Sequence, residues 1–190
     1  MNWCTKEFLG YDYKDPFAWL QGMFEIERVA ALSELRYKVR SLRTHKLRCW
    51  HERRQAALFT LCIAKRFPEY RFDFAHPNIE NSPYDAIVRW QYTGAVGFTP
   101  LQLKELVPEE CKTDASLAEI LSDLAKYSGD RQLVVAIYLN RRLRFVPKRI
   151  RLSNIGGLFF FGSASPDLMH WILIGDLLRS TDVSIYSFPR

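Results

Sequence analysis

Two strand-like segments within residues 84–105 constrain this chain more than any other feature. The sequence YDAIVRWQYTGAVGFTPLQLKE has strand-like segments rich in apolar residues on both sides of a Thr-Gly turn, which predicts a β-hairpin. We expect the first strand to carry Asp85 among apolar neighbours, and the second to carry Gln102 and Lys104 on one face. A charge among apolar strand residues is unfavourable unless it is paired or bound to a cation. These three side chains therefore need a partner or a ligand.

Length and composition favour one domain with a hydrophobic core. The chain has 190 residues, of which 48% are hydrophobic. We expect residues 1–44 to form a helical arm that packs on an α/β domain of residues 45–190, with a single domain overall. The four cysteines include no CxxC pair, and no apolar run matches a signal peptide or the length of a bilayer. These features predict a cytoplasmic protein with reduced thiols and no membrane partner.

Periodic apolar patterns order the remaining elements. They predict helices over residues 17–42, 44–67 and 114–127. Residues 69–75 alternate as a strand, and residues 132–140 form an apolar run typical of a parallel strand covered on both faces. Residues 158–188 are expected to add further strands, although their HWILIGDLL segment also fits a helix.

Two basic clusters give the chain a net charge of +6, which favours an anionic partner. Lys and Arg contacts to phosphate supply most of the sequence-independent affinity for nucleic acid. A plain solvated face is the alternative interpretation of such clusters. The residues expected to contact nucleic acid are Arg40, Arg43, Lys46, Arg48, Arg53, Arg141, Arg142, Arg144, Lys148 and Arg149.

Glu52 is the acidic residue within the first basic cluster. It shares a helical face with Ala56 and Phe59, which are expected to pack inward. An acid on that face needs a partner, and an ion pair with Arg48 or Arg53 is the structural alternative to a functional role.

Several catalytic signatures are absent. The HERRQ segment has Gln55 where a zincin helix needs its second His, and GLFFFGS lacks the Lys of a phosphate-binding loop. No GxSxG elbow is present.

A helix with Glu52, a strand with Asp85 and a strand with Gln102-x-Lys104, followed by a helix and a buried strand, resembles the PD-(D/E)xK nuclease superfamily. The resemblance covers roughly residues 45–140. It implies an α/β, restriction-endonuclease-like αβββαβ core with a mixed central sheet, here with an N-terminal helical arm and extra C-terminal strands. The chain departs from the family pattern in two ways: Gln102 replaces the acid of the last motif, and Tyr84 separates Pro83 from Asp85.

The resemblance implies a divalent-metal-dependent nuclease, with DNA as the expected substrate because the family acts mostly on DNA. Glu52, Asp85 and Gln102 would hold Mg²⁺ or Mn²⁺ through oxygen atoms, and Lys104 would assist the attacking water. Asp73, also in an expected strand, competes with Asp85 for this role, and a buried Asp85–Lys104 salt bridge is the structural alternative.

Two other functions remain open. One is a nucleic-acid-binding module that keeps the fold without catalysis, with Gln102 as the sign of that loss. The other is a protein–protein adaptor, and the chain is also compatible with a homodimer or a protein partner. The aromatic residues expected at an adaptor surface are Phe159, Phe160, Phe161 and Trp171.

Overall fold

The computed structural model describes residues 7–31, 39, 41–77, 82–125, 127, 130–144 and 146–188. Its elements are helix α2 (Pro16–Ala31), the 3₁₀ helix η1 (His45–Leu47), helix α4 (Arg48–Arg66), strands β1 (Arg71–Ala75), β2 (Ala86–Tyr92) and β3 (Ala95–Leu106), helix α5 (Leu117–Leu124), and strands β4 (Asp130–Leu139), β5 (Ile155–Ser163), β6 (His170–Ile174) and β7 (Val183–Ser187). Hydrogen bonding orders the strands β1-β2-β3-β4-β5-β6-β7 in one mixed sheet. The expected α/β class is confirmed.

The chain divides into two compact units, Met1–Phe98 with Arg190 and Thr99–Pro189, and the boundary falls inside β3. The first unit holds α2, α4, β1 and β2, and the second holds α5 and the strands from β4 onwards. The expected boundary between residues 44 and 45 stays a prediction.

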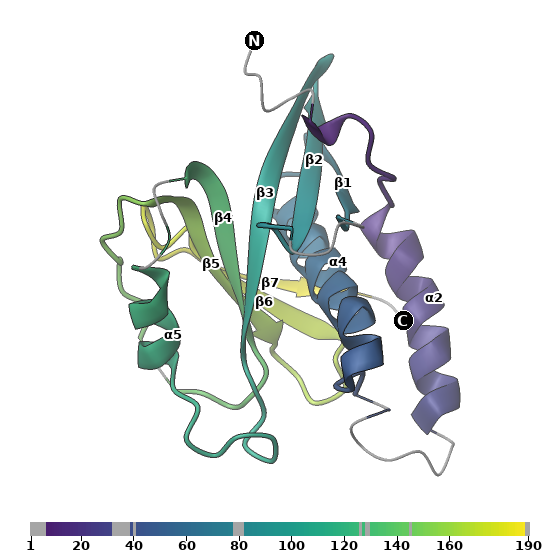
Figure 1. The fold of residues 1–190 in the computed structure, drawn as a ribbon, viewed down its shortest axis with the longest axis vertical. Helices are drawn as coiled ribbons and strands as arrows, with labels where there is room; N and C mark the ends of the chain where they lie inside the picture. Colours follow the sequence, from purple (N-terminus) through teal and green to yellow (C-terminus); the bar gives the residue numbers. More distant parts are fainter. Residues whose placement is uncertain are drawn as a thin grey trace. The chain divides into compact units, whose positions relative to one another are not determined.

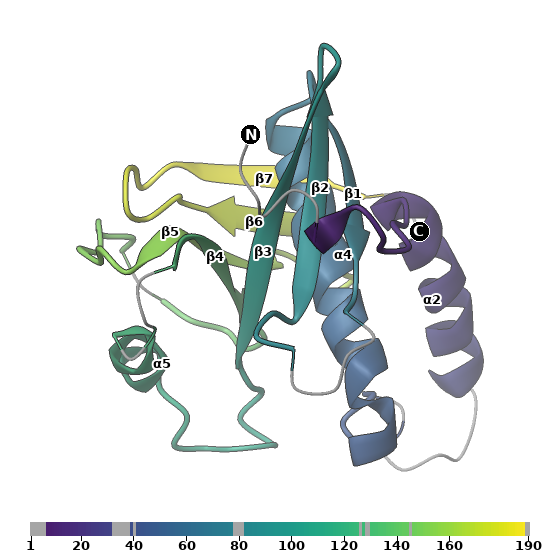
Figure 2. The ribbon, with the colours of Figure 1, turned by 45° about the horizontal axis from the view of Figure 1, so that its top comes forward.

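Helix α4 is the central element of the first unit. It packs against β1 and β2 on one side, and α2 lies alongside it (Figures 1 and 2). Its residues from Gln55 to Ile63 are all buried, which is expected of a helix covered on several sides. The helix ends at Arg66 because Pro68 cannot continue it.

Helix α2 confirms the start of the first expected helix. Its side chains reach α4 through an ion pair between Glu27 and Arg54 and through stacked rings of Trp19 and Trp50. The expected continuation to residue 42 includes residues 32–38 and 40, which lie outside the described part of the chain.

The turn of the expected hairpin forms at Thr93 and Gly94, whose φ angles of 42° and 84° give the left-handed geometry of a tight hairpin turn. One expectation was wrong: Asp85 lies in the bend just before β2 rather than inside the strand. β1 pairs antiparallel with β2 and places Asp73 opposite Arg89.

The second unit is built on β4, which runs parallel to both β3 and β5, as its apolar sequence predicts. Ser116 caps α5 by accepting a hydrogen bond from the backbone N–H of Glu119 at 3.1 Å, so the helix is shorter than expected. β5, β6 and β7 pair antiparallel in turn, and their neighbouring ribbons are visible in Figure 2.

The HWILIGDLL segment forms β6 and a following turn, so its helical alternative was wrong. The aromatic residues Phe160, Phe161 and Trp171 are buried at 2%, 0% and 0% exposure, and the Trp171 indole donates to the Leu168 carbonyl. They belong to the core and offer no surface to an adaptor's partner. Phe159 is partly exposed.

Candidate functional site

Glu52 lies near the beginning of α4 with a side chain that is 21% exposed. The Nε atom of Arg48, one helical turn earlier, donates to Glu52 Oε1 at 2.7 Å. The Nε2 atom of His76 lies 3.7 Å from Oε2, too far for a direct hydrogen bond but close enough for attraction when His76 is protonated. Of the expected partners, Arg48 is therefore present, and His76 is one that the sequence did not indicate.

These neighbours keep Glu52 ionised. His76 and Arg48 hold the pKa of Glu52 below its usual range, although partial burial of the carboxyl acts in the opposite direction. Glu52 in turn raises the pKa of Arg48. A carboxylate held in this state suits an ion pair or a metal ligand better than a general acid.

Asp85 interacts electrostatically with the same arginine, Arg48. It is partly exposed at the entrance to β2. Two of the four predicted catalytic residues, Glu52 and Asp85, thus interact electrostatically with the same guanidinium group.

Gln102 and Lys104 lie on β3 in the second unit. Both are partly exposed, whereas Leu101 and Leu103 between and beside them are 0% and 7% exposed, so the polar pair shares one face of the strand. The Lys104 amine lies 5.8 Å from the centre of the Tyr127 ring. Convergence of this pair with Glu52 and Asp85 stays a prediction.

The predicted metal ligands are all oxygen donors, which fit Mg²⁺ and Mn²⁺ in chemical kind. Only Glu52 and Asp85 would bring negative charge, and both interact with Arg48. Among the described residues, no three or more His, Cys, Asp or Glu side chains form a group that could hold a metal ion.

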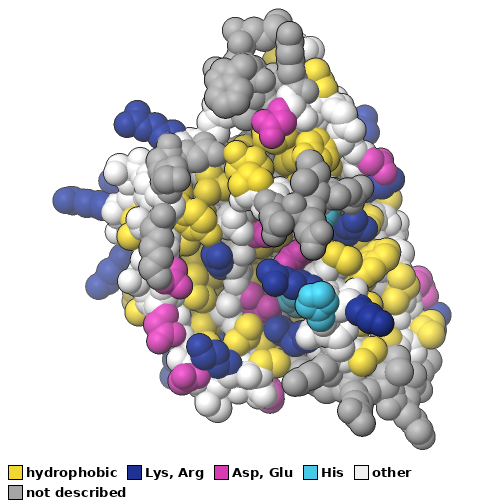
Figure 3. All heavy atoms as spheres, viewed as in Figure 1, with side chains coloured by type: hydrophobic (Ala, Val, Ile, Leu, Met, Phe, Trp, Pro, Cys, Tyr) yellow, Lys and Arg dark blue, Asp and Glu magenta, His cyan; other side chains and the backbone are white. Residues whose placement is uncertain are grey.

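The first basic cluster is only partly available to an anion. Arg40 lies outside the described residues, Lys46 is exposed, and Arg48 is bonded to Glu52 although its side chain is 76% exposed. Figure 3 shows Lys or Arg, Asp or Glu, and His side chains close together on one face. Opposite charges are therefore intermixed on that face.

Arg53 has an aromatic neighbour that the sequence analysis missed. Its guanidinium lies 5.6 Å from the ring of Trp50, which is 39% exposed and stacks on Trp19. Helical spacing of an Arg three residues after a Trp was the available signal. Arg53 also lines a cavity of about 80 Å³ with His76, too small to hold a nucleotide.

The second basic cluster contains one arginine with a structural role. The Arg141 guanidinium donates to the carbonyl oxygens of Val107, Lys112 and Ala115, and so holds the connection between β3 and α5. The other members are exposed, and they are Arg142, Arg144, Lys148 and Arg149.

Comparisons with protein-family models, curated protein sequences and solved structures found no match. Within the ranges that the structure describes, no helix has both the length and the apolar character needed to cross a membrane.

Proposed function

We propose that the chain is a divalent-metal-dependent nuclease of the PD-(D/E)xK kind. The observation that supports it most is the order and direction of its core elements. α4 is followed by the antiparallel strands β1 and β2, then by β3, α5 and a strand β4 that runs parallel to β3. This is the αβββαβ order that the resemblance implies.

The positions of the polar residues along those elements also support the proposal. Glu52 is on α4, Asp85 immediately precedes β2, and the Gln102-x-Lys104 pair is on β3. Each residue thus occupies the element, or its entrance, to which the family pattern assigns it.

The chemistry would divide among these side chains. Asp85 and the amide oxygen of Gln102 would hold a divalent cation, with ionised Glu52 joining directly or through water. A bound cation would polarise the scissile phosphate and lower the pKa of a bound water. Lys104 would orient the attacking water or neutralise the charge that develops on the phosphate. Exposed Lys and Arg side chains would position the nucleic-acid backbone.

A nicking assay tests this proposal. Purified protein is incubated with supercoiled plasmid, or with single-stranded DNA or RNA, in Mg²⁺, Mn²⁺ or EDTA. We expect cleavage only with a divalent cation, and a fall of about 100-fold or more in Asp85→Asn and Lys104→Met. Matched controls are Asp114→Asn and Lys65→Met, because both side chains are exposed and lie outside the proposed centre. Full activity of Asp85→Asn would contradict the proposal.

A second candidate is a nucleic-acid-binding module without catalysis. It is favoured by the engagement of Glu52 with Arg48 and His76, and by the neutral Gln102 where the family has an acid. Salt-sensitive gel shifts without any cleavage in Mg²⁺ or Mn²⁺ would select this candidate over the nuclease.

A further inference from the structure

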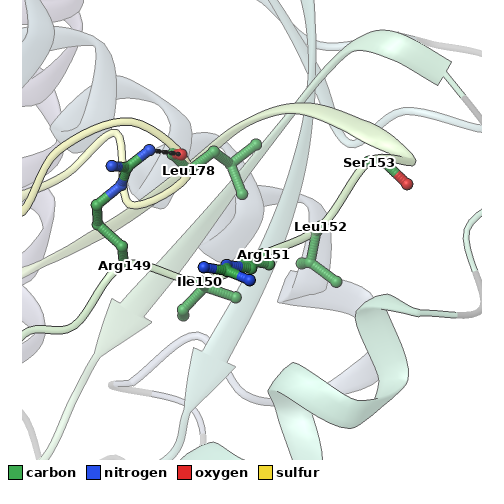
Figure 4. A pocket seen from close by; sticks show the side chains of 6 residues that line it. All are labelled: Arg149, Ile150, Arg151, Leu152, Ser153 and Leu178. Atoms are coloured by element: carbon green, nitrogen blue, oxygen red, sulfur yellow. Dashed lines mark hydrogen bonds between the residues drawn. The ribbon is translucent and has the colours of Figure 1, made fainter.

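A pocket of about 550 Å³ lies within the second unit, on the connection between β4 and β5 (Figure 4). Its volume is in the range of small-molecule sites, roughly 300–1,000 Å³. The residues that line it are Arg149, Ile150, Arg151, Leu152, Ser153 and Leu178.

Hydrogen bonds fix one wall of this pocket. The backbone N–H of Ile150 donates to the Leu177 carbonyl at 2.9 Å, and the Arg149 guanidinium donates to the Leu178 carbonyl at 3.4 Å, as the dashed line in Figure 4 marks. The Asp176 carboxylate accepts hydrogen bonds from the backbone N–H groups of Leu158 on β5 and of Leu178. It thereby fixes the connection between β6 and β7, which contains Leu178, to β5. The lining segments are therefore held in place by the backbone of the second unit.

The pocket has a positive lining. Arg149 and Arg151 are exposed, and no acidic residue is among the residues that line it. Within the described part of the chain, Arg151 has no carboxylate partner, and the same holds for Arg142, Arg144 and Lys148 nearby in sequence. Asp176, close to Leu178 in the chain, is already paired with Arg179. Basic charge without a neutralising acid favours an anionic ligand.

Apart from Ser153, the remaining lining residues are apolar. Ile150, Leu152 and Leu178 are partly exposed and border the space beside the two arginines, as Figure 4 shows. A free phosphate or a carboxylate would use only the charged part of a pocket of this volume. An anion that also carries a larger body with an apolar face, such as a nucleobase, would use both parts.

We propose that this pocket binds a nucleotide phosphate, with the phosphate on Arg149 and Arg151 and the nucleoside against Ile150, Leu152 and Leu178. Guanidinium groups match phosphate oxygens with paired hydrogen bonds, and two of them balance the charge of a phosphomonoester. In a nucleic acid, the matching group is a phosphorylated strand end. That extension rests on the proposed nuclease function, whereas nucleotide binding itself needs neither Asp85 nor Lys104.

Calorimetric titration of the full chain without metal tests the pocket, with AMP, adenosine and inorganic phosphate as probes. We expect AMP to bind at least about tenfold more tightly than either adenosine or phosphate, because only AMP engages both parts of the lining. Arg151→Gln should weaken AMP binding about tenfold or more, and Arg149→Gln should do the same.

Arg131→Gln is the matched control, because Arg131 is an exposed arginine of the second unit that does not line the pocket. It should keep AMP affinity within about twofold. Equal losses of AMP affinity in Arg131→Gln and Arg151→Gln, or AMP binding no tighter than phosphate binding, would contradict nucleotide binding at this pocket. Thermal melting checks that each variant is folded. Arg151 makes no hydrogen bond to the backbone of the described residues, so Arg151→Gln removes none.

The pocket and the proposed nuclease can fail separately. If AMP binding depends on Arg151 but the protein cleaves no nucleic acid, nucleotide binding at the pocket is supported and the proposed nuclease function is contradicted. If the protein shows metal-dependent cleavage but no AMP binding, nucleotide binding at the pocket is contradicted and the proposed nuclease function is supported.

Discussion

Two acidic residues of the first unit differ in burial: Asp73 is almost fully buried, whereas the Glu52 side chain is 21% exposed. Asp73 is 2% exposed, and its Oδ2 accepts from both Nε and Nη2 of Arg89 at 3.2 and 2.6 Å. The same guanidinium lies 4.5 Å from the ring centre of Tyr13, whose pKa is raised by burial. Asp73 is thus committed to an ion pair inside the unit, which leaves Asp85 as the better candidate for a ligand.

Replacing Asp73 should test that assignment. Asp73→Ala leaves Arg89 without its buried partner, so we expect the free energy of unfolding to fall by about 2–4 kcal/mol. Asp114→Ala, at an exposed position, should change it by less than about 0.5 kcal/mol. Urea denaturation measures both, and equal effects would show that the Asp73–Arg89 pair has no special role.

The lowered pKa of Glu52 predicts a pH-dependent contribution to stability. Because the folded pKa lies below the unfolded one, about 4.3, the contribution is fully present above that pH and is lost as pH falls through the folded pKa. Wild type should therefore exceed Glu52→Gln in stability most at neutral pH, and the difference should shrink in acid. Urea denaturation midpoints of both proteins, at neutral pH and at acidic pH, measure the difference in stability. A difference that is larger at acidic pH than at neutral pH would contradict the prediction.

At the scale of elements, glycine positions show which segments tolerate a side chain. Gly22 is exposed on α2, and a Cβ there would meet no atom within 4 Å. Gly162 is on β5, where a Cβ would lie 2.7 Å from the Leu139 carbonyl oxygen of the neighbouring β4. The first glycine is replaceable, and the second allows two strand backbones to approach closely.

Alanine at these two glycines should shift stability in opposite directions. Gly22→Ala should raise the free energy of unfolding by about 0.5–1 kcal/mol because it restricts the unfolded chain. Gly162→Ala should lower it by about 1–3 kcal/mol because the added methyl overlaps a backbone carbonyl. Thermal melting compares the two, and a stabilising Gly162→Ala would refute the close β4–β5 approach.

Local patterns predicted most elements, because periodicity and capping act over short distances. The 3.6-residue spacing of apolar residues located α5 within the expected range 114–127, and the apolar run of residues 132–140 located β4. The HWILIGDLL segment could not be resolved in this way, since a short apolar run fits a buried helix or a strand equally. Pairing of Trp171 with Tyr186 across β6 and β7, a contact distant in sequence, decides it.

The candidate site was predictable only in part, for the same reason. Helical spacing pointed to Arg48 as a partner of Glu52, but His76 lies in a different segment and enters through tertiary structure. Arg141 looked like any other member of a basic run, and only the fold shows that its donors are bound to backbone carbonyls. Charge counts do not separate structural arginines from available ones.

At the scale of the whole molecule, the net charge of +6 predicts salt-sensitive binding to nucleic acid. Arg142, Arg144 and Lys148 are exposed and lack carboxylate partners within the described residues, so each is available to a phosphate. Replacing one of them by Gln should weaken binding similarly for all sequences and reduce the slope of log K against log salt by about 1. Fluorescence anisotropy over a salt series measures this slope, and an unchanged slope would exclude that residue from the interface.

The Mg²⁺ dependence of plasmid nicking, compared between wild type and Gln102→Glu, tests the proposed metal-dependent cleavage most directly. An acid at position 102 adds negative charge to the proposed ligand set, so Gln102→Glu should reach half of its maximal rate at a Mg²⁺ concentration several-fold lower than wild type. Absence of nicking in both proteins at every concentration of Mg²⁺ and Mn²⁺, or identical metal dependence in the two, would contradict the proposed centre.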